Sequence, residues 1–444
     1  MRPPSRPIPK KIGKVKLEHE SDTPKPPIDF DQLATEIAFA PLAEKRERAL
    51  QAIQDLLNFG VYPASIARWY RAIAAGKLPW MTIPAFNLRG NTYQVARRVW
   101  RMALKFEVGA VIFELAPSEA DVSDQSFEEY TALVLTAAAS EGYQGPVFLQ
   151  GDHFDIPANG DLEAVQNLCQ QAIQAGMYQI DVDGCHLFGA DETSLAAFHQ
   201  PNVLATAEII QFIRNLQPTG IEIVIGGEVG VIGGTNTTPT DLQAFLTAVQ
   251  AALPPDLPGL DKISAQTGTR HGGVVNPDGS AGRMELDLQL ANQLSHIARS
   301  DFGLAGLVQH GASTLQIAEL AQLKTKEVIE VHLATGIQNI IFDHPAFPPE
   351  LRARIKAELV QPETGPEGAL PESEDGLSPA QQFYNVRWAA WGPFKRELWA
   401  IPEAAWDEIC VDLDEWFAQV FQALGVTGQY KNMANYYSLE RPTK

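Results

Sequence analysis

Short apolar runs alternate with helix-like stretches between residue 80 and residue 345 of the chain. An alternation of this kind is typical of βαβ units, whose strands lie parallel in one sheet. The eight runs lie at residues 81–87, 108–115, 146–150, 178–183, 221–228, 262–266, 306–310 and 339–343. Eight strands over about 265 residues, with helices between them, match the size of a closed (β/α)8 barrel. We therefore predict an α/β fold, a TIM barrel with an N-terminal helical extension and C-terminal helices.

The parts of the chain outside the barrel differ from it in composition. A basic, proline-rich segment at 1–29 predicts a flexible tail, and residues 30–79 are expected to form helices. We expect the catalytic barrel to span 80–360, followed by an acidic loop at 361–380 and a helical segment at 381–444. The apolar spacing of this last segment fits packing against the barrel or another subunit, so we expect a homodimer or homotetramer.

The composition excludes some classes of protein. The chain has 444 residues and a formal net charge of -20, whereas a nucleic-acid-binding face needs clustered basic residues. No apolar run reaches the roughly 18 residues that cross a bilayer, and the N-terminus lacks the apolar segment of a signal peptide. We therefore expect a cytoplasmic protein without nucleic-acid or membrane partners. Cys169, Cys185 and Cys410 lack a metal-binding spacing and are expected to be reduced thiols.

Three histidines share one setting, because each lies just past an apolar run. They are His153, His271 and His310. A parallel barrel brings the C-terminal ends of distant strands to one rim, where these imidazoles could meet. Three imidazoles with an open position are typical of a catalytic zinc site, although a single histidine after a strand is more often a hydrogen-bonded core or rim residue. The shared setting favours the metal site. Four other histidines are expected in the tail, at the surface or in helix packing: His19, His199, His296 and His332.

Six short motifs occur in an order that is typical of one enzyme family. They are IPAFN at 83–87, GDH at 151–153, VDGCH at 182–186, GGEVGVIGG at 226–234, TGTRHGG at 267–273 and HGAS at 310–313. With these motifs the chain resembles the class II, zinc-dependent fructose-bisphosphate aldolases. FYNVRWAAW at 383–391 is similar to a C-terminal stretch of the longer members. Because six motifs agree in order, the resemblance is far more specific than any one of them.

The resemblance implies roles for particular residues. The implied zinc ligands are His153, His271 and His310, and the implied catalytic residues are Asp152, Glu228 and Asp183. Asp152 matches the catalytic base, Glu228 the acidic residue near the metal, and Asp183 the residue that supports it. Substrate contacts are implied for Asn87, Glu114, Gly272, Gly311, Ser313, Asp343, His344 and Arg387. Arg387 matches an arginine that grips the far phosphate.

The implied chemistry is the reversible retro-aldol cleavage of a ketose between C3 and C4. A divalent metal on the C2 and C3 oxygens would disperse the electron density left on C3 as a metal enediolate. Asp152, next to a predicted ligand, would take the proton of the C4 hydroxyl. The alternative role of Asp152 is to orient an imidazole. Zn²⁺ is the expected cofactor, although three histidines also leave cobalt and manganese open.

Several positions depart from the aldolase pattern. A family acidic pair that supplies a proton donor for C3 is replaced by the Thr-Asn-Thr of residues 235–237. On the second strand, Glu114 stands in place of Gln and Ala116 in place of a phosphate-binding Ser. On the expected eighth strand, the Asn-x-Asp/Asn-Thr pattern becomes residues 341–344. A carboxylate near an anionic substrate is unfavourable, and we expect a protonated His344 to offset the charge of Glu114.

Three functions fit this set of residues. The first is a class II aldolase-type lyase of carbohydrate metabolism, or glycolysis, acting on a ketose (bis)phosphate such as fructose 1,6-bisphosphate. The second is a ketose C4-epimerase, which cleaves and re-forms the bond without a C3 proton donor. The third is a non-catalytic metal-binding subunit, which the presence of all three histidines and Asp152 disfavours. Because the phosphate contacts are altered, we expect poorer use of the bisphosphate than in ordinary family members.

Overall fold

The computed structural model describes residues 28–189, 194–360 and 377–437. The predicted tail before residue 28 and most of the predicted acidic loop, residues 361–376, lie outside the described residues. Within the described ranges, no helix is both long and apolar enough to cross a membrane.

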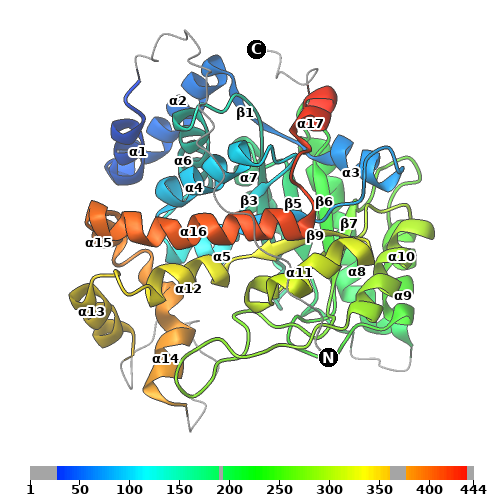
Figure 1. Ribbon diagram of the computed structural model, residues 1–444. Coiled ribbons are helices and arrows are strands. Elements are labelled where there is room, and N and C mark those ends of the chain that lie inside the picture. Colours follow the sequence, from blue (N-terminus) through cyan, green and yellow to red (C-terminus); the bar gives the residue numbers. More distant parts are fainter. Residues whose placement is uncertain (1–27, 190–193, 361–376, 438–444) are drawn as a thin grey trace, which may run out of the picture.

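Eight parallel strands close into a barrel, as the sequence predicts (Figure 1). The barrel strands are β2 (Ile83–Asn87), β3 (Ile112–Leu115), β4 (Gly145–Asp155), β5 (Gln179–Asp183), β6 (Val224–Val229), β7 (Lys262–Ala265), β8 (Leu307–Gln309) and β9 (Val328–Leu333). The sheet closes because β9 pairs with β2, with Ile83 opposite Glu330, and because β4 pairs with β5. The fold is therefore a (β/α)8 TIM barrel with additional helices, and the C-terminal ends of its strands form one rim.

The eighth strand lies earlier in the chain than the sequence predicts. Residues 339–343, the expected strand, belong to α12 (Thr335–Asp343), and the strand is β9 instead. The mistake has a physical cause, since β9 directs Glu330 and His332 into the barrel interior and so does not read as an apolar run. In α12 the buried Ile337 and Ile341 are four residues apart, which is helical spacing.

The N-terminal segment is helical except for one strand. Its helices are α1 (Phe30–Phe39), α2 (Leu42–Phe59) and α3 (Ala67–Ala74). Between α2 and α3, β1 (Val61–Ala64) pairs in parallel with the first residues of β4, from Gly145 to Phe148. β4 has room for this partner because its 11 residues begin well before its pairing with β5 starts at Gln150. The prediction of helices alone for this segment was therefore wrong.

Helices surround the barrel on the outside (Figure 1). Those between the strands are α4 (Thr92–Lys105), α5 (Pro117–Val122), α6 (Phe127–Ser140), α7 (Leu162–Gln174), α8 (Leu195–Leu216), α9 (Pro239–Ala252), α10 (Leu288–Ser300) and α11 (Ile317–Leu323). After α12 follow α13 (Pro349–Leu359), α14 (Pro379–Val386), α15 (Lys395–Trp399), α16 (Glu403–Leu424) and α17 (Tyr430–Tyr437). The long α16 packs Phe417 and Phe421 against Phe86 of β2, which fixes the C-terminal segment to the barrel.

Candidate metal centre and active site

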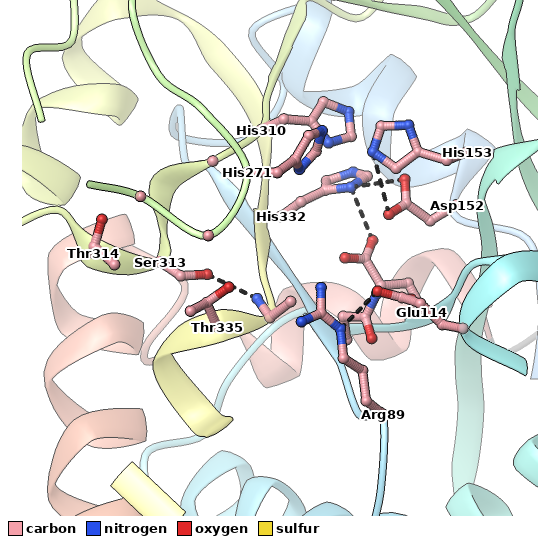
Figure 2. A pocket seen from close by; sticks show the side chains of 16 residues that line it. Arg89, Glu114, Asp152, His153, His271, His310, Ser313, Thr314, His332 and Thr335 are labelled. Carbon is pink, nitrogen blue, oxygen red and sulfur yellow. Dashed lines mark hydrogen bonds and ion pairs between the residues drawn. The ribbon is translucent and has the colours of Figure 1, made fainter. Parts of the chain in front are cut away.

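The three predicted metal ligands meet at the rim of the barrel (Figure 2). His153 lies two residues before the end of β4, His271 follows β7, and His310 follows β8. The ring centroid of His153 lies 4.9 Å from that of His271 and 4.5 Å from that of His310. One nitrogen of each ring lies within 4.8 Å of the nitrogens of the other two. Residues separated by up to 157 positions in the sequence are thus brought to one point, which is the spacing that a shared metal ion requires.

A bulge in β4 places two consecutive side chains at this point. The pairing of β4 with β5 shifts in register between Gly151 and Phe154, and His153 takes a left-handed backbone conformation with φ of 44°. A Cβ atom on Gly151 would lie 2.3 Å from the ring of Phe154, so a larger residue would not fit without a shift. In a regular strand, consecutive side chains point to opposite faces. The bulge lets both Asp152 and His153 reach the site.

The donor atoms fit a divalent cation. Nε2 of His153 and Nε2 of His310 are buried and have no hydrogen-bond partner among the described residues. Nδ1 of His153 lies 2.9 Å from Oε1 of Glu228 and 3.3 Å from Oδ2 of Asp183. A carboxylate on the second ring nitrogen is the usual support of a metal-binding histidine. Glu228 therefore lies near the candidate metal position and Asp183 contacts the same ring, while the catalytic roles implied for both stay predictions.

The carboxylates around His153 create a strongly negative site. Burial alone would lower the pKa of His153, but Asp152 and Glu228 raise it well above its ordinary value. Burial, reinforced by the nearby Asp183, raises the pKa of Glu228 to about 8. Both raised pKa values favour binding of a proton at the site. A metal ion can supply the same positive charge.

Asp152 lies between two imidazoles and is 4% exposed. Its Oδ2 is 3.8 Å from Nε2 of His153, and its Oδ1 is 3.1 Å from Nδ1 of His332. Burial opposes ionisation, but these two imidazoles lower the pKa of Asp152 well below its ordinary value. The lowered pKa favours the carboxylate form of Asp152, which is the form that a proton acceptor needs.

His332 is the main feature of the site that the sequence analysis missed. It was expected in a helix, but it lies on β9 with Nδ1 3.1 Å from Oε2 of Glu114 and Nε2 2.6 Å from Oε1 of Glu330. Burial alone would lower the pKa of His332, but Glu114 and Asp152 raise it well above its ordinary value. The basic partner of Glu114 is therefore His332, and the prediction that His344 fills this role was wrong.

The corrected strand changes which residues stand at the end of the eighth barrel strand. They are residues 332–335, His-Leu-Ala-Thr, in place of residues 341–344. His344 instead follows α12, where its Nε2 lies 3.5 Å from Oδ2 of Asp412. The sequence signal that could have revealed His332 is the alternation of Val328–Leu333, whose polar positions point inward.

A buried polar network lies beneath the site. Nζ of Lys262 is 2.6 Å from Oε1 of Glu330, 2.7 Å from Oε1 of Gln150 and 3.0 Å from Asp181. The hydroxyl of Tyr70, from α3, donates to Glu330. Because Glu330 also contacts His332, this network links the N-terminal segment to the site and holds the His332 ring in place.

A pocket opens above the histidines (Figure 2). Among the predicted residues, its lining contains Asn87, Glu114, Asp152, His153, His271, Gly272, His310, Gly311 and Ser313. The lining also contains Gly273, next to the predicted Gly272, and residues that the sequence analysis did not assign to it, namely Arg89, Glu119, Thr314, His332, Ala334 and Thr335. Glu228 and Asp183 lie behind the histidines, where they contact His153. The pocket is thus walled by residues from the ends of most barrel strands.

One side of the pocket carries groups suited to an anion. Nε of Arg89 donates to Oε1 of Glu119 at 2.7 Å, and Figure 2 shows the guanidinium pointing into the pocket. The hydroxyl of Thr314 is buried without a hydrogen-bond partner among the described residues. Oγ of Ser313 accepts the backbone N–H of Ala334 at 2.8 Å. Arg89 lies only two residues after β2, so its place at a strand end was the signal that could have found it.

Three predicted substrate contacts lie outside the lining of this pocket. Arg387 is buried and donates to Oδ1 of Asn339 at 2.7 Å and to Oδ2 of Asp343 at 3.0 Å. Its guanidinium also lies 4.5 Å from the ring centroid of Tyr384. Asp343 and His344 stand at the end of α12, because the expected strand there is a helix. The assignment of these two to the end of the eighth strand was wrong, and phosphate binding by Arg387 stays a prediction.

The fold and the site define a TIM-barrel enzyme of the aldolase superfamily. The family model described as fructose-bisphosphate aldolase class-II matches residues 73–366. Because this match spans more than half of the chain, the chain belongs to the class II fructose-bisphosphate aldolase family. None of the curated proteins compared with the chain matches it.

Solved structures with this fold include both aldolases and an epimerase. The fructuronate-tagaturonate epimerase UxaE from Cohnella laeviribosi is 12% identical, with a TM-score of 0.55 over 86% of this chain and 86% of the other. Fructose-bisphosphate aldolase from Campylobacter jejuni is 19% identical, with a TM-score of 0.50 over 83% of this chain and 96% of the other. At such low identities the likeness establishes the fold alone.

Proposed function

We propose that this protein reversibly cleaves the C3–C4 bond of a ketose that carries an anionic group, with a divalent metal ion held by His153, His271 and His310. The observation that carries the proposal is the meeting of the three histidines beside the buried carboxyl group of Asp152. We further propose Zn²⁺ as the metal, since three imidazoles with open positions suit it. A homodimer or homotetramer and a cytoplasmic location stay predictions.

The residues divide the chemistry between them. His153, His271 and His310 would hold the cation, which would supply a Lewis acid for the sugar oxygens next to the breaking bond. Asp152 accepts the proton of the C4 hydroxyl, and its Oδ2 faces the ring of His153. Glu228 and Asp183 hold the His153 ring in orientation. Asn87, whose Nδ2 donates to Glu119, lines the wall where the sugar hydroxyls would lie.

A sugar phosphate is the proposed substrate class. Arg89, Ser313, Thr314 and the glycines after His271 and His310 line one side of the pocket and offer a cation, hydroxyls and exposed backbone. Such loops at the ends of the last barrel strands commonly bind phosphate. Arg89 is placed to provide the charge that the sequence analysis assigned to Arg387.

The second candidate is a ketose C4-epimerase of the same mechanism. It is favoured by residues 235–237, which place no carboxylate where the family has its acidic pair. In the structure Thr237 has a structural role, because its hydroxyl donates to the backbone of Val229 and accepts from that of Gln266. Epimerisation needs the base and the cation but no protonation at C3. The same fold occurs in the solved structure of the epimerase UxaE.

A substrate panel tests both reactions together. Metal-loaded protein is incubated with ketose mono- and bisphosphates, ketouronates and free ketoses, and NMR follows aldehyde products and C4 epimers. Cleavage products support the lyase, and a new epimer without free aldehyde supports the epimerase. A family aldolase that converts its own sugar in a parallel experiment is the control. If the metal-loaded protein changes none of these sugars while the control is active, the result favours the non-catalytic subunit.

A further inference from the structure

We propose a second divalent-cation site beside the histidine site, formed by Glu114 of β3, Asp152 of β4 and His332 of β9. We call it the carboxylate–His332 site. The proposal goes beyond the proposed function, because it does not depend on which sugar reacts. Its ligand is a divalent ion that accepts mixed oxygen and nitrogen donors, such as Mn²⁺.

The spacing of the donor atoms matches that of metal ligands. Nδ1 of His332 lies 3.1 Å from Oε2 of Glu114 and 3.1 Å from Oδ1 of Asp152. In an octahedral site with metal–oxygen distances of about 2.1 Å, neighbouring ligand atoms are about 3.0 Å apart. One donor atom from each of the three side chains lies within 4.8 Å of the others, and all three residues line the pocket (Figure 2). An ion can therefore enter from the same opening as the substrate.

Two of these donor atoms are buried and face each other. Nδ1 of His332 and Oδ1 of Asp152 lie 3.1 Å apart, outside regular hydrogen-bond geometry but within ion-pair distance. His332 is 5% exposed and Asp152 is 4% exposed. Buried polar atoms are rarely left without a partner, and either a proton or a metal ion between these two atoms would satisfy both.

The other face of His332 is prepared for metal binding. Its Nε2 lies 2.6 Å from Oε1 of Glu330, which Lys262 also contacts at 2.6 Å. An N–H at Nε2 that donates to Glu330 leaves the lone pair of Nδ1 directed at Glu114 and Asp152. This arrangement of carboxylate, imidazole and cation is the common support of metal-binding histidines.

Many carboxylates gather around the proposed site. Six that are each at most 5% exposed lie inside this end of the barrel: Glu114, Asp152, Asp181, Asp183, Glu228 and Glu330. Lys262 forms ion pairs with Asp181 and Glu330, and His332 is the basic side chain that faces Glu114 and Asp152. A divalent ion at Nδ1 of His332 would supply the positive charge that a proton on this ring otherwise supplies.

The site combines two kinds of metal ligand. Carboxylates and an imidazole both bind divalent ions, and Glu114, Asp152 and His332 bring them together. The second ion would hold Oδ1 of Asp152 and leave Oδ2 facing His153, so that Asp152 still accepts a proton in the proposed reaction.

Metal counting with Mn²⁺ tests the site without an activity measurement. Purified full-length protein is stripped of metal, titrated with Mn²⁺, and counted by elemental analysis and electron paramagnetic resonance. We expect two ions per chain with a spin-coupled signal, because Asp152 would lie between them. His332→Asn and Glu114→Gln each replace a proposed ligand by a neutral amide, and each should reduce the count to one and remove the coupling. His296→Asn, at an exposed position of α10, is the matched control and should keep two ions.

Two other metal counts would overturn the proposal, and a third result would separate it from the proposed function. One ion per chain in the unmodified protein, unchanged in His332→Asn, would show that a protonated His332 forms an ion pair with the two carboxylates. Loss of both ions in a folded His332→Asn would show that His332 only supports the histidine site. Two ions in a protein that turns over no ketose would refute the proposed function and leave the carboxylate–His332 site standing.

Discussion

Nζ of Lys262 lies 2.6 Å from Oε1 of Glu330, and both side chains are fully buried inside the barrel. A buried ammonium beside two carboxylates is costly to remove, because the carboxylates of Glu330 and Asp181 then stay in the interior without their partner. Lys262→Met should therefore lower the free energy of unfolding by about 3–5 kcal/mol. Chemical denaturation measures this loss. Lys77→Met, at an exposed position, should change stability little, and equal effects of the two substitutions would contradict the account.

Asp152 is expected to act in proton transfer. Asp152→Asn keeps the shape of the side chain but removes the proton acceptor, so turnover should fall by about 10²–10⁴-fold. The ion held by the three histidines should remain bound, as elemental analysis of the variant would show. Loss of that ion would mean that Asp152 mainly supports the metal ligands.

Arg89 is expected to bind the anionic group of the substrate. Arg89→Gln should raise KM for a phosphorylated ketose by roughly 10- to 100-fold, since a hydrogen bond to a charged group contributes about 1.5–3 kcal/mol. An unphosphorylated ketose that is turned over should show little change in KM. Arg283→Gln, at an exposed arginine, provides the control. Equal losses on both kinds of substrate would place the anion elsewhere in the pocket.

Glu141, which is not part of the candidate active site, should make the stability of the fold depend on pH. Burial would raise its pKa, but hydrogen bonds from Arg101 and Arg97, each at 2.9 Å, outweigh burial and lower it. A pKa that is lower in the folded state stabilises the fold above the unfolded value of about 4.3, and this contribution disappears as the pH falls through the folded value.

Glu141→Gln should accordingly be less stable than the unmodified protein at pH 7. Arg97 and Arg101 are 31% and 42% exposed, so solvent screening limits the difference to about 1 kcal/mol or less. The difference should shrink toward pH 3, which thermal unfolding across this range measures. A stability difference that grows as the pH falls would contradict the prediction that the folded state lowers the pKa of Glu141.

Much of the barrel could be predicted from the sequence because most of its strands are apolar runs between helices. The exception is β9, where Glu330 and His332 point inward and break the apolar pattern. Their inward orientation is explained by Lys262, which contacts Glu330, and by Glu114, which contacts His332. Both partners come from strands that are distant in the sequence. A sequence pattern reports neighbours along the chain, and these partners are neighbours only across the barrel.

The site was predictable to a similar extent. The strand-end setting of His153, His271 and His310 was enough to expect that they meet, and the structure brings them together. Arg89 and His332 were missed, the first because it lies in a loop after β2 and the second because its strand was placed elsewhere. Asp343 and His344 were assigned to the eighth strand for the same reason, since their helix contains the β-branched run of residues 340–341.

Metal-dependent turnover in histidine variants tests the central claim most directly. The protein and its His153→Ala, His271→Ala and His310→Ala variants are stripped of metal and reloaded with Zn²⁺, and ketose cleavage or C4 epimerisation is followed by NMR. We predict turnover in the reloaded protein, none after chelation, and loss of both the ion and the turnover in each folded variant. Undiminished turnover in metal-free protein, or in a folded His271→Ala variant without its ion, would contradict the account.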